Sequence, residues 1–309
     1  MESIAMPKVL ITGAGGQVGY KLTALAGKSG FSVFAAGHAD LDITDRSQVN
    51  SAVARELPDV IINAAAYTAV DRAESDREAA YELNCRGAGF LAEAAHKARI
   101  PLLHISTDYV YPGKGTEPEK EDDPTAPSNV YGQTKLDGEK AALDACERTI
   151  VMRTAWVFCE HGNNFIKTML RLGKTHPELR VVDDQIGGPT YAGDIAESLL
   201  RMASSVLGCS DFTEYGIYNY CGSPFVSWRE FAEAIFSGAA EQGILKEKVR
   251  VTPIPSSAYP TPAVRPLNSR LSMEKIGRVF GISPSDWKAA LRDLSGYAPS
   301  LDGRKFSSA

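Results

Sequence analysis

One pair of side chains in the sequence has the types and the spacing needed to reduce a carbonyl group. Tyr131 and Lys135 form a Tyr-x-x-x-Lys pattern in a segment predicted to be helical, so both project from one helix face. Reduction of a ketone needs an acid that protonates the developing alkoxide, and a free phenol, with a pKa of about 10, is sluggish at neutral pH. The Lys135 ammonium, together with an oxidised nicotinamide, would favour the phenolate and lower that pKa. The pattern alone is not specific, because a surface tyrosine packed on a lysine stem also produces it.

A hydroxyl group that could hold the carbonyl oxygen is expected close to this pair. Thr107 directly follows a predicted strand over residues 101–106, and residues 63–66 close the preceding strand in the same way. Ligands of parallel sheets bind at the carboxyl ends of the strands, and a hydroxyl there can donate to an alkoxide. The sequence therefore supplies an acid, a group that tunes it and a group that positions the substrate. The predicted catalytic residues are Tyr131, Lys135 and Thr107.

A glycine-rich turn near the start of the chain predicts a dinucleotide site. Gly13, Gly16 and Gly19 fit the spacing G-x-x-G-x-x-G, whereas the tighter G-x-G-x-x-G fails because residue 18 is Val. Glycines between a strand and a helix let the backbone approach a pyrophosphate, whose charge then meets the free N–H groups of the helix start. The alternative is a glycine-rich turn that binds nothing. Its position, between predicted strand 8–12 and predicted helix 17–26, favours the cofactor.

The residues after the second strand leave NADH and NADPH open. An acidic side chain there would bind the ribose 2′-hydroxyl and an arginine would bind a 2′-phosphate, but residues 35–38 read Ala-Ala-Gly-His. The next acidic residues are Asp40, Asp42 and Asp45. Asp42 could face the adenine side of the cofactor, and Asp45 could instead cap a helix that begins near residue 46.

These side chains need a scaffold, and the hydrophobic pattern of the first half predicts one. Strands are expected at residues 8–12, 31–36, 59–64, 101–106 and 149–157, and helices at 17–26, 48–56, 77–98 and 131–146. Buried strands that alternate with helices pair in parallel, so the fold class is α/β with a Rossmann-type doubly wound sheet.

The second half of the chain is less regular. Helices are expected at residues 163–173, 193–204 and 227–236, separated by glycine- and proline-rich connections. We therefore expect an NAD(P)-binding domain over residues 1–160 and a smaller, mainly substrate-binding C-terminal lobe over residues 161–309. Part of residues 186–222 should return to the first domain.

Composition excludes several other classes of protein. The chain is 44% hydrophobic and 23% charged with a net charge of −5, so no basic excess favours a nucleic-acid partner. No apolar run approaches the ~20 residues of a membrane span. Five scattered cysteines without Cys-x-x-Cys spacing are typical of reduced thiols in a cytoplasmic protein, and the five histidines show no metal-ligand spacing. We expect no metal-binding residues, no membrane association and a cytoplasmic location.

Several longer segments carry a resemblance to a known family. Residues 63–74, 106–111, 153–158, 162–165 and 259–271, together with the glycine turn and the Tyr–Lys pair, resemble the dTDP-4-dehydrorhamnose reductase family of extended short-chain dehydrogenases/reductases. The resemblance covers roughly residues 7–294. It implies NADH- or NADPH-dependent reduction of the C4 keto group of dTDP-4-dehydro-L-rhamnose to dTDP-L-rhamnose, a step in the synthesis of cell-surface polysaccharide.

The resemblance also implies which residues bind the two ligands. The expected cofactor contacts are Gly13, Gly16, Gln17, Val18, Gly19, Asp42, Ile43, Ala64, Ala65, Ala66, Tyr67, Thr68, Tyr131 and Lys135. The expected contacts with the dTDP-sugar are Thr107, Asp108, Tyr109, Trp156, Asn164 and Arg265. Some relatives are described as Mg²⁺-linked dimers, so a homodimer with Mg²⁺ at its interface is left open.

Two other readings compete with a reductase. A nucleotide-sugar dehydratase or epimerase shares the fold, but dehydratases typically follow the active-site Thr-Asp with a glutamate, where this chain has Tyr109. A non-catalytic protein similar to the regulatory subunit of methionine adenosyltransferase would also keep the fold. Residues 153–156 and 265–270 resemble the bacterial reductases more closely, which favours the enzyme.

Overall fold

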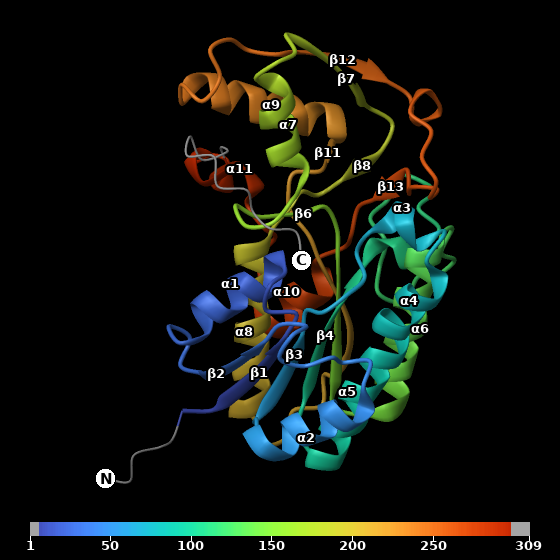
Figure 1. Cartoon of the computed structure of the whole chain (residues 1–309), viewed down its shortest axis with the longest axis vertical. Helices are drawn as coiled ribbons and strands as arrows, with labels where there is room; N and C mark the ends of the chain where they lie inside the picture. Colours follow the sequence, from blue (N-terminus) through green and yellow to red (C-terminus); the bar gives the residue numbers. More distant parts are fainter. Residues whose placement is uncertain (1–5, 298–309) are drawn as a thin grey trace.

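The computed structural model describes residues 6–297 and is built around a six-stranded parallel sheet (Figure 1). The strands are β1 (Lys8–Thr12), β2 (Ser32–Ala36), β3 (Val60–Asn63), β4 (Leu102–Thr107), β5 (Thr149–Thr154) and β10 (Gly216–Tyr220). Their order is β10-β5-β4-β3-β1-β2, and every neighbouring pair is parallel. The chain leaves β1 for β2 on one side and then crosses to β3 on the other, so the switch point lies between β1 and β3.

Helices cover both faces of this sheet. One face packs against α1 (Gln17–Ala26), α8 (Ala192–Gly208) and α10 (Glu274–Phe280), and the other against α2 (Arg46–Glu56), α5 (Gly87–Ala98) and α6 (Val130–Ala145). Side chains alternate between the two cores, as a strand requires: Val9 and Ile11 face the first core and Leu10 the second. The predicted Rossmann-type doubly wound fold is confirmed.

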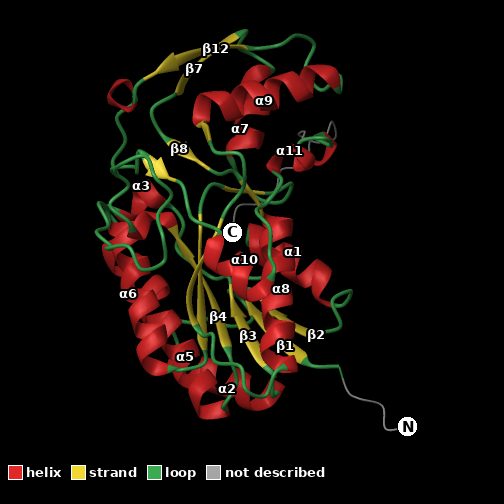
Figure 2. Cartoon of the chain, turned by 180° about the vertical axis from the view of Figure 1, so that it is seen from behind, coloured by secondary structure: helices red, strands yellow, loops and turns green. Residues whose placement is uncertain are grey.

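A smaller lobe sits beyond the carboxyl ends of the strands (Figure 2). Its core packs α7 (Phe165–Gly173), α9 (Trp228–Glu241) and α11 (Trp287–Ala290) with a parallel pair, β7 (Glu178–Val182) and β12 (Arg250–Ile254). Short strands connect it to the sheet: β6 (Val157–Phe158) pairs with β9 (Thr190–Tyr191), and β8 (Ile186–Gly187) lies between β11 (Val226–Ser227) and β13 (Asn268–Ser269). Within residues 186–222, β10 is an edge strand of the large sheet and α8 packs on its face. The domain boundary near residue 160 stays a prediction.

Two predicted elements are interrupted in the structure. The strand expected over residues 149–157 ends at Thr154, because Trp156 has a positive φ of 50°, which a strand does not allow. The helix expected over residues 77–98 is divided into α4 (Arg77–Tyr81), a π-helical turn (Glu82–Arg86) and α5. A further short helix, α3 (Val70–Ala73), precedes them. Both interruptions lie next to the candidate site described below.

Membrane-spanning helices and clusters of metal ligands are both absent from the described part of the chain. Within residues 6–297, no helix has the length and apolar character needed to cross a bilayer. The same residues hold no cluster of three or more His, Cys, Asp or Glu side chains that could bind a metal ion.

Candidate functional site

The glycine turn has the geometry of a site for an anionic group. Gly13 has a φ of +67°, and a Cβ there would lie 2.5 Å from the Ala65 backbone nitrogen. A Cβ on Gly19 would lie 2.1 Å from the Gly13 carbonyl oxygen, so both positions require glycine. The following helix α1 starts after Gly16 with no side-chain cap and no acidic residue in its first turn. Its N-terminal N–H groups are therefore available to a pyrophosphate at the β1–β3 switch point.

Two buried asparagines shape the segment opposite this turn, which contains the predicted cofactor residues Ala64, Ala65, Ala66, Tyr67 and Thr68. The Asn63 side-chain oxygen accepts from the Thr12 hydroxyl at 2.7 Å and from the Ala65 N–H at 3.0 Å. Asn84 accepts from the Tyr67 N–H at 2.8 Å and donates to the Tyr67 carbonyl at 3.2 Å.

Asn84 is a residue that the sequence did not single out. It lies in the π-helical turn, a distortion that is common at functional sites. The one available signal was a polar residue in an otherwise amphipathic helical segment. It is packed so closely that a Cβ on Gly138 of α6 would lie 2.0 Å from its carbonyl oxygen.

The acidic residues after β2 are largely engaged by their own backbone. Asp45 caps α2 by accepting from the Ser47 and Gln48 N–H groups, the alternative that the sequence allowed. The Asp42 carboxylate accepts from the Thr44 N–H at 2.9 Å and from its hydroxyl at 2.8 Å. Ile43 is buried. Contacts of Asp42 and Ile43 with the cofactor stay predictions.

The three predicted catalytic residues lie where β4 meets the start of α6. Asn129 caps this helix by accepting from the Gly132 N–H at 2.7 Å, which places Tyr131 in its first turn. The Tyr131 ring packs edge-on against Tyr109, with 5.5 Å between centroids. A Cβ on Gly132 would lie 2.3 Å from the Tyr109 carbonyl oxygen, so the helix packs directly on the segment that follows Thr107.

The electrostatic state of Tyr131 differs from the expectation. Burial raises its pKa to about 12, the hydrogen bond with Thr107 counteracts this, and Asp108 raises it further. The sequence predicted that the Lys135 ammonium, together with an oxidised nicotinamide, would lower this pKa. In the structure the Lys135 amine is directed at the Ile105 carbonyl, 2.6 Å away, and is not among the groups that shift the pKa of Tyr131, whereas the effect of the nicotinamide stays a prediction. Tyr131 is consequently a protonated phenol at neutral pH, the form that must donate a proton to a reduced carbonyl.

Lys135 and Asp108 are both buried with shifted pKa values. Burial lowers the pKa of Lys135 to about 8, against the opposing effect of Glu139. Burial raises the pKa of Asp108 to about 6. One Asp108 oxygen accepts from the Thr107 hydroxyl at 3.0 Å, and the other has no partner among the described residues. Perturbed groups of this kind are concentrated at functional sites.

A buried ion pair lies beneath the candidate site, next to the carboxyl ends of β4 and β5. Arg153 on β5 and Glu139 on α6 are 2% and 1% exposed and lie 2.6 Å apart. Glu139 also accepts from the Ser106 hydroxyl at 2.5 Å, and Arg153 donates to the Tyr111 hydroxyl at 2.8 Å. The pair thus ties α6, which carries Tyr131 and Lys135, to the ends of β4 and β5.

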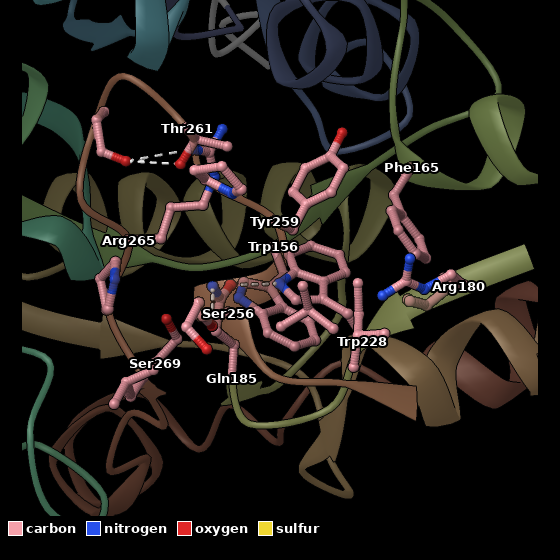
Figure 3. Close-up of a pocket in the computed structure, with 18 of the residues that line it drawn as sticks. Trp156, Phe165, Arg180, Gln185, Trp228, Ser256, Tyr259, Thr261, Arg265 and Ser269 are labelled. Carbon is pink, nitrogen blue, oxygen red and sulfur yellow. Dashed lines mark hydrogen bonds between the residues drawn. The ribbon is translucent and has the colours of Figure 1, made fainter. Parts of the chain in front are cut away.

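A cavity of about 700 Å³ opens between this edge and the lobe (Figure 3). Of the predicted substrate residues, Tyr109, Trp156 and Arg265 line it. Trp156 stacks on Trp228, with 3.6 Å between ring centroids and 11° between planes. The cavity is also lined by residues that the sequence did not nominate, among them Phe165, Arg180, Trp228 and Tyr259.

The other predicted substrate residues do not line the cavity, and Arg265 is already paired with a carboxylate. Thr107 and Asp108 are buried at the end of β4. Asn164 caps α7 and donates to Gln17 at 3.1 Å, which links the lobe to the glycine turn. Arg265, although it lines the cavity, is held by both oxygens of Asp71 at 2.9 and 2.8 Å.

A doubly wound sheet, a glycine turn at its switch point and a Tyr–Lys pair at its carboxyl edge define an extended short-chain dehydrogenase/reductase. The comparisons narrow this class. The family profile described as RmlD substrate binding domain matches residues 7–296, and the chain belongs to this family.

Individual relatives agree over nearly their full length. The chain is 47% identical over 294 residues to dTDP-4-dehydrorhamnose reductase of Aggregatibacter actinomycetemcomitans, which covers 95% of this chain and 100% of that protein. It is 40% identical to the protein of the same name from Escherichia coli K12, covering 93% and 96% of the two chains. The crystal structure of dTDP-4-dehydrorhamnose reductase from Bacillus anthracis in complex with NADP superposes with a TM-score of 0.83 at 36% identity, covering 92% and 97%.

Proposed function

We propose that this protein reduces the C4 keto group of dTDP-4-dehydro-L-rhamnose with NADPH or NADH, giving dTDP-L-rhamnose for cell-surface polysaccharide. One observation carries the proposal: a large, mainly apolar cavity, with Trp156 and Trp228 in its wall, reaches Tyr109, whose ring packs against Tyr131. Full-length similarity to relatives named dTDP-4-dehydrorhamnose reductase supports the choice of substrate.

The cofactor would lie across the β1–β3 switch point. Gly13, Gly16 and the first N–H groups of α1, from Gln17, Val18 and Gly19, would bind its pyrophosphate. Asp42 and Ile43 would lie at its adenosine end, and Ala64 to Thr68 would line its path toward Tyr131. When bound, the reduced nicotinamide supplies the hydride that the carbonyl carbon accepts.

The residues of the chain would then supply position and a proton. The Thr107 hydroxyl would turn from Asp108 to donate to the carbonyl oxygen, and the Tyr131 phenol would donate its proton to that oxygen as negative charge develops. The raised pKa of Tyr131 keeps this proton in place until the substrate arrives. Lys135, on the same helix face, would bind the cofactor beside Tyr131.

The sugar nucleotide would occupy the cavity. Trp156 and Tyr109 offer apolar faces and hydrogen-bond donors to the sugar, and Asp108 would lie at its reacting end. A diphosphate needs cationic partners, which Arg265 would provide by sharing its guanidinium with Asp71. Asn164 would close the site from the side of the lobe.

The proposal is tested by incubating the purified protein with NADPH and dTDP-4-dehydrorhamnose. We expect NADPH consumption matched by dTDP-L-rhamnose. Loss of water from a dTDP-hexose or inversion of a UDP-sugar without net NADPH consumption would favour a dehydratase or an epimerase. Tight NADPH binding without turnover of any sugar nucleotide would favour a non-catalytic subunit. The homodimer, Mg²⁺ at its interface and the cytoplasmic location stay predictions, of which the first two are checked by sedimentation with and without a chelator.

A further inference from the structure

A chain of buried polar side chains runs from the glycine turn to Lys135 and passes through His104. Asn63 and His104 are register partners on β3 and β4. The Asn63 amide nitrogen lies 2.9 Å from His104 Nδ1, and His104 Nε2 lies 3.4 Å from the Lys135 amine. Asn63, His104 and Lys135 are each 1% exposed. Nothing in the proposed reaction assigns a role to His104.

The hydrogen bonds around Asn63 fix the tautomer of this histidine. The Asn63 side-chain oxygen accepts from the Ala65 N–H, a backbone group that can only donate, and from the Thr12 hydroxyl. The Asn63 amide nitrogen is therefore the atom that faces His104 and donates to Nδ1. Burial lowers the pKa of His104 well below its usual range, and the charged form of Lys135 lowers it further, so the ring is neutral in either state of the lysine. A neutral imidazole that accepts at Nδ1 carries its proton on Nε2.

We propose that His104 is a positioning residue for Lys135: its Nε2–H is directed at the lysine nitrogen and holds it against the Ile105 carbonyl. An uncharged amine satisfies both contacts, because it can accept from His104 and donate to Ile105 at 2.6 Å. An ammonium would place two donors face to face. His104 therefore favours the uncharged form of Lys135, in the same direction as burial.

The other groups that face Lys135 set the opposing effect. Glu139, one turn along α6, raises the pKa of Lys135, and Glu139 is itself bound by Arg153 from β5. The balance leaves Lys135 with a pKa of about 8. A group that titrates near the working pH exchanges protons readily. His104 would thus prepare Lys135 to restore the proton that Tyr131 gives up in each turnover, a role that rests on the proposed function.

The direct test follows the titration of Lys135 in the full-length protein by NMR of ¹³C-labelled lysine side chains, assigned with Lys135→Arg. Glutamine places an amide oxygen near the position of Nε2, where it accepts from an ammonium instead of opposing it. We expect His104→Gln to move the Lys135 midpoint upward by about one pH unit from its wild-type value. His104→Asn keeps a partner for Asn63 and removes the group that faces Lys135, so its midpoint should also rise. The His104→Asn variant provides the test if the His104→Gln variant does not fold.

Leu103→Ala is the matched control, because it removes a buried side chain from the same strand that packs in the opposite core. It should lower stability and leave the Lys135 midpoint in place. Midpoints within about 0.3 pH units of wild type in both folded His104 variants would overturn the proposal. The NMR titration needs no substrate, so it decides the role of His104 even if the protein does not reduce the dTDP-sugar. If the protein does reduce the dTDP-sugar, the alkaline limb of kcat/KM in the His104 variants should move to higher pH together with the Lys135 midpoint.

Discussion

Replacing Glu139 by Gln tests the buried support of the site. The substitution keeps the size of the side chain but leaves the Arg153 guanidinium, 2% exposed, without its carboxylate. Breaking a buried ion pair from one side costs about 3–5 kcal/mol. Gln retains one carbonyl acceptor and Arg153 retains the Tyr111 hydroxyl at 2.8 Å, so we expect the free energy of unfolding to fall by ~3 kcal/mol. Chemical denaturation gives this value, and the melting temperature should fall by roughly 4–6 °C.

The same substitution has a kinetic signature. The Glu139 carboxylate stabilises the Lys135 ammonium and so raises the pKa of Lys135, which burial lowers to about 8. Without the carboxylate this pKa falls further, and the alkaline limb of kcat/KM should move to lower pH. A double variant, Glu139→Leu with Arg153→Met, removes both charges and should recover much of the lost stability. A loss below ~1 kcal/mol for Glu139→Gln, or a double variant no more stable than the single one, would refute the reasoning.

Three further predictions concern the cavity and the cofactor. Trp156→Phe should lower kcat/KM for the dTDP-sugar by roughly 10- to 100-fold with a small change in melting temperature, and the reverse pattern would make Trp156 a core residue. Asp71→Asn removes the ion pair that holds Arg265, which should raise KM for the dTDP-sugar more than it lowers kcat. The hydrogen bond with Arg265 lowers the pKa of Asp71, so the stabilising effect of this pair is present above the unfolded pKa of about 3.9 and lost as the pH falls through the lower folded value. Steady-state kinetics with both cofactors should show turnover with each and a preference for NADPH, because no carboxylate occupies residues 35–38. A preference above ~100-fold for NADH would assign the ribose contact to Asp40, which binds the Gly37 N–H at 2.9 Å.

The periodic elements of the sheet could be predicted from the sequence because their signals are local. Strand β1 and helix α1 have the predicted bounds, since an apolar run and an amphipathic run are separated by glycines. The short strands of the lobe could not be predicted, because β8 and β13 are two residues long and exist only through pairing with distant segments.

The site likewise has features that local sequence patterns predict and features that depend on distant segments. The Tyr–Lys spacing could be recognised because it is a local property of one helix. The proximity of Tyr131 to Thr107 could be predicted because ligands of parallel sheets bind at the carboxyl ends of the strands, where Thr107 lies. The direction of the Lys135 amine could not, because it depends on Ile105 and His104 of another element. The partner of Arg265 is 194 residues away in sequence, a distance at which spacing carries no information.

The central claim is that Tyr131 donates the proton in an NADPH-dependent reduction of dTDP-4-dehydrorhamnose. The most direct measurement compares single-turnover reduction by wild type and Tyr131→Phe, with NADPH binding measured on both by fluorescence titration. Phe removes only the hydroxyl, so we predict unchanged fold and NADPH affinity with a rate lowered by ~10²-fold or more. A Tyr131→Phe protein that binds NADPH and reduces the dTDP-sugar at nearly the wild-type rate would contradict the account.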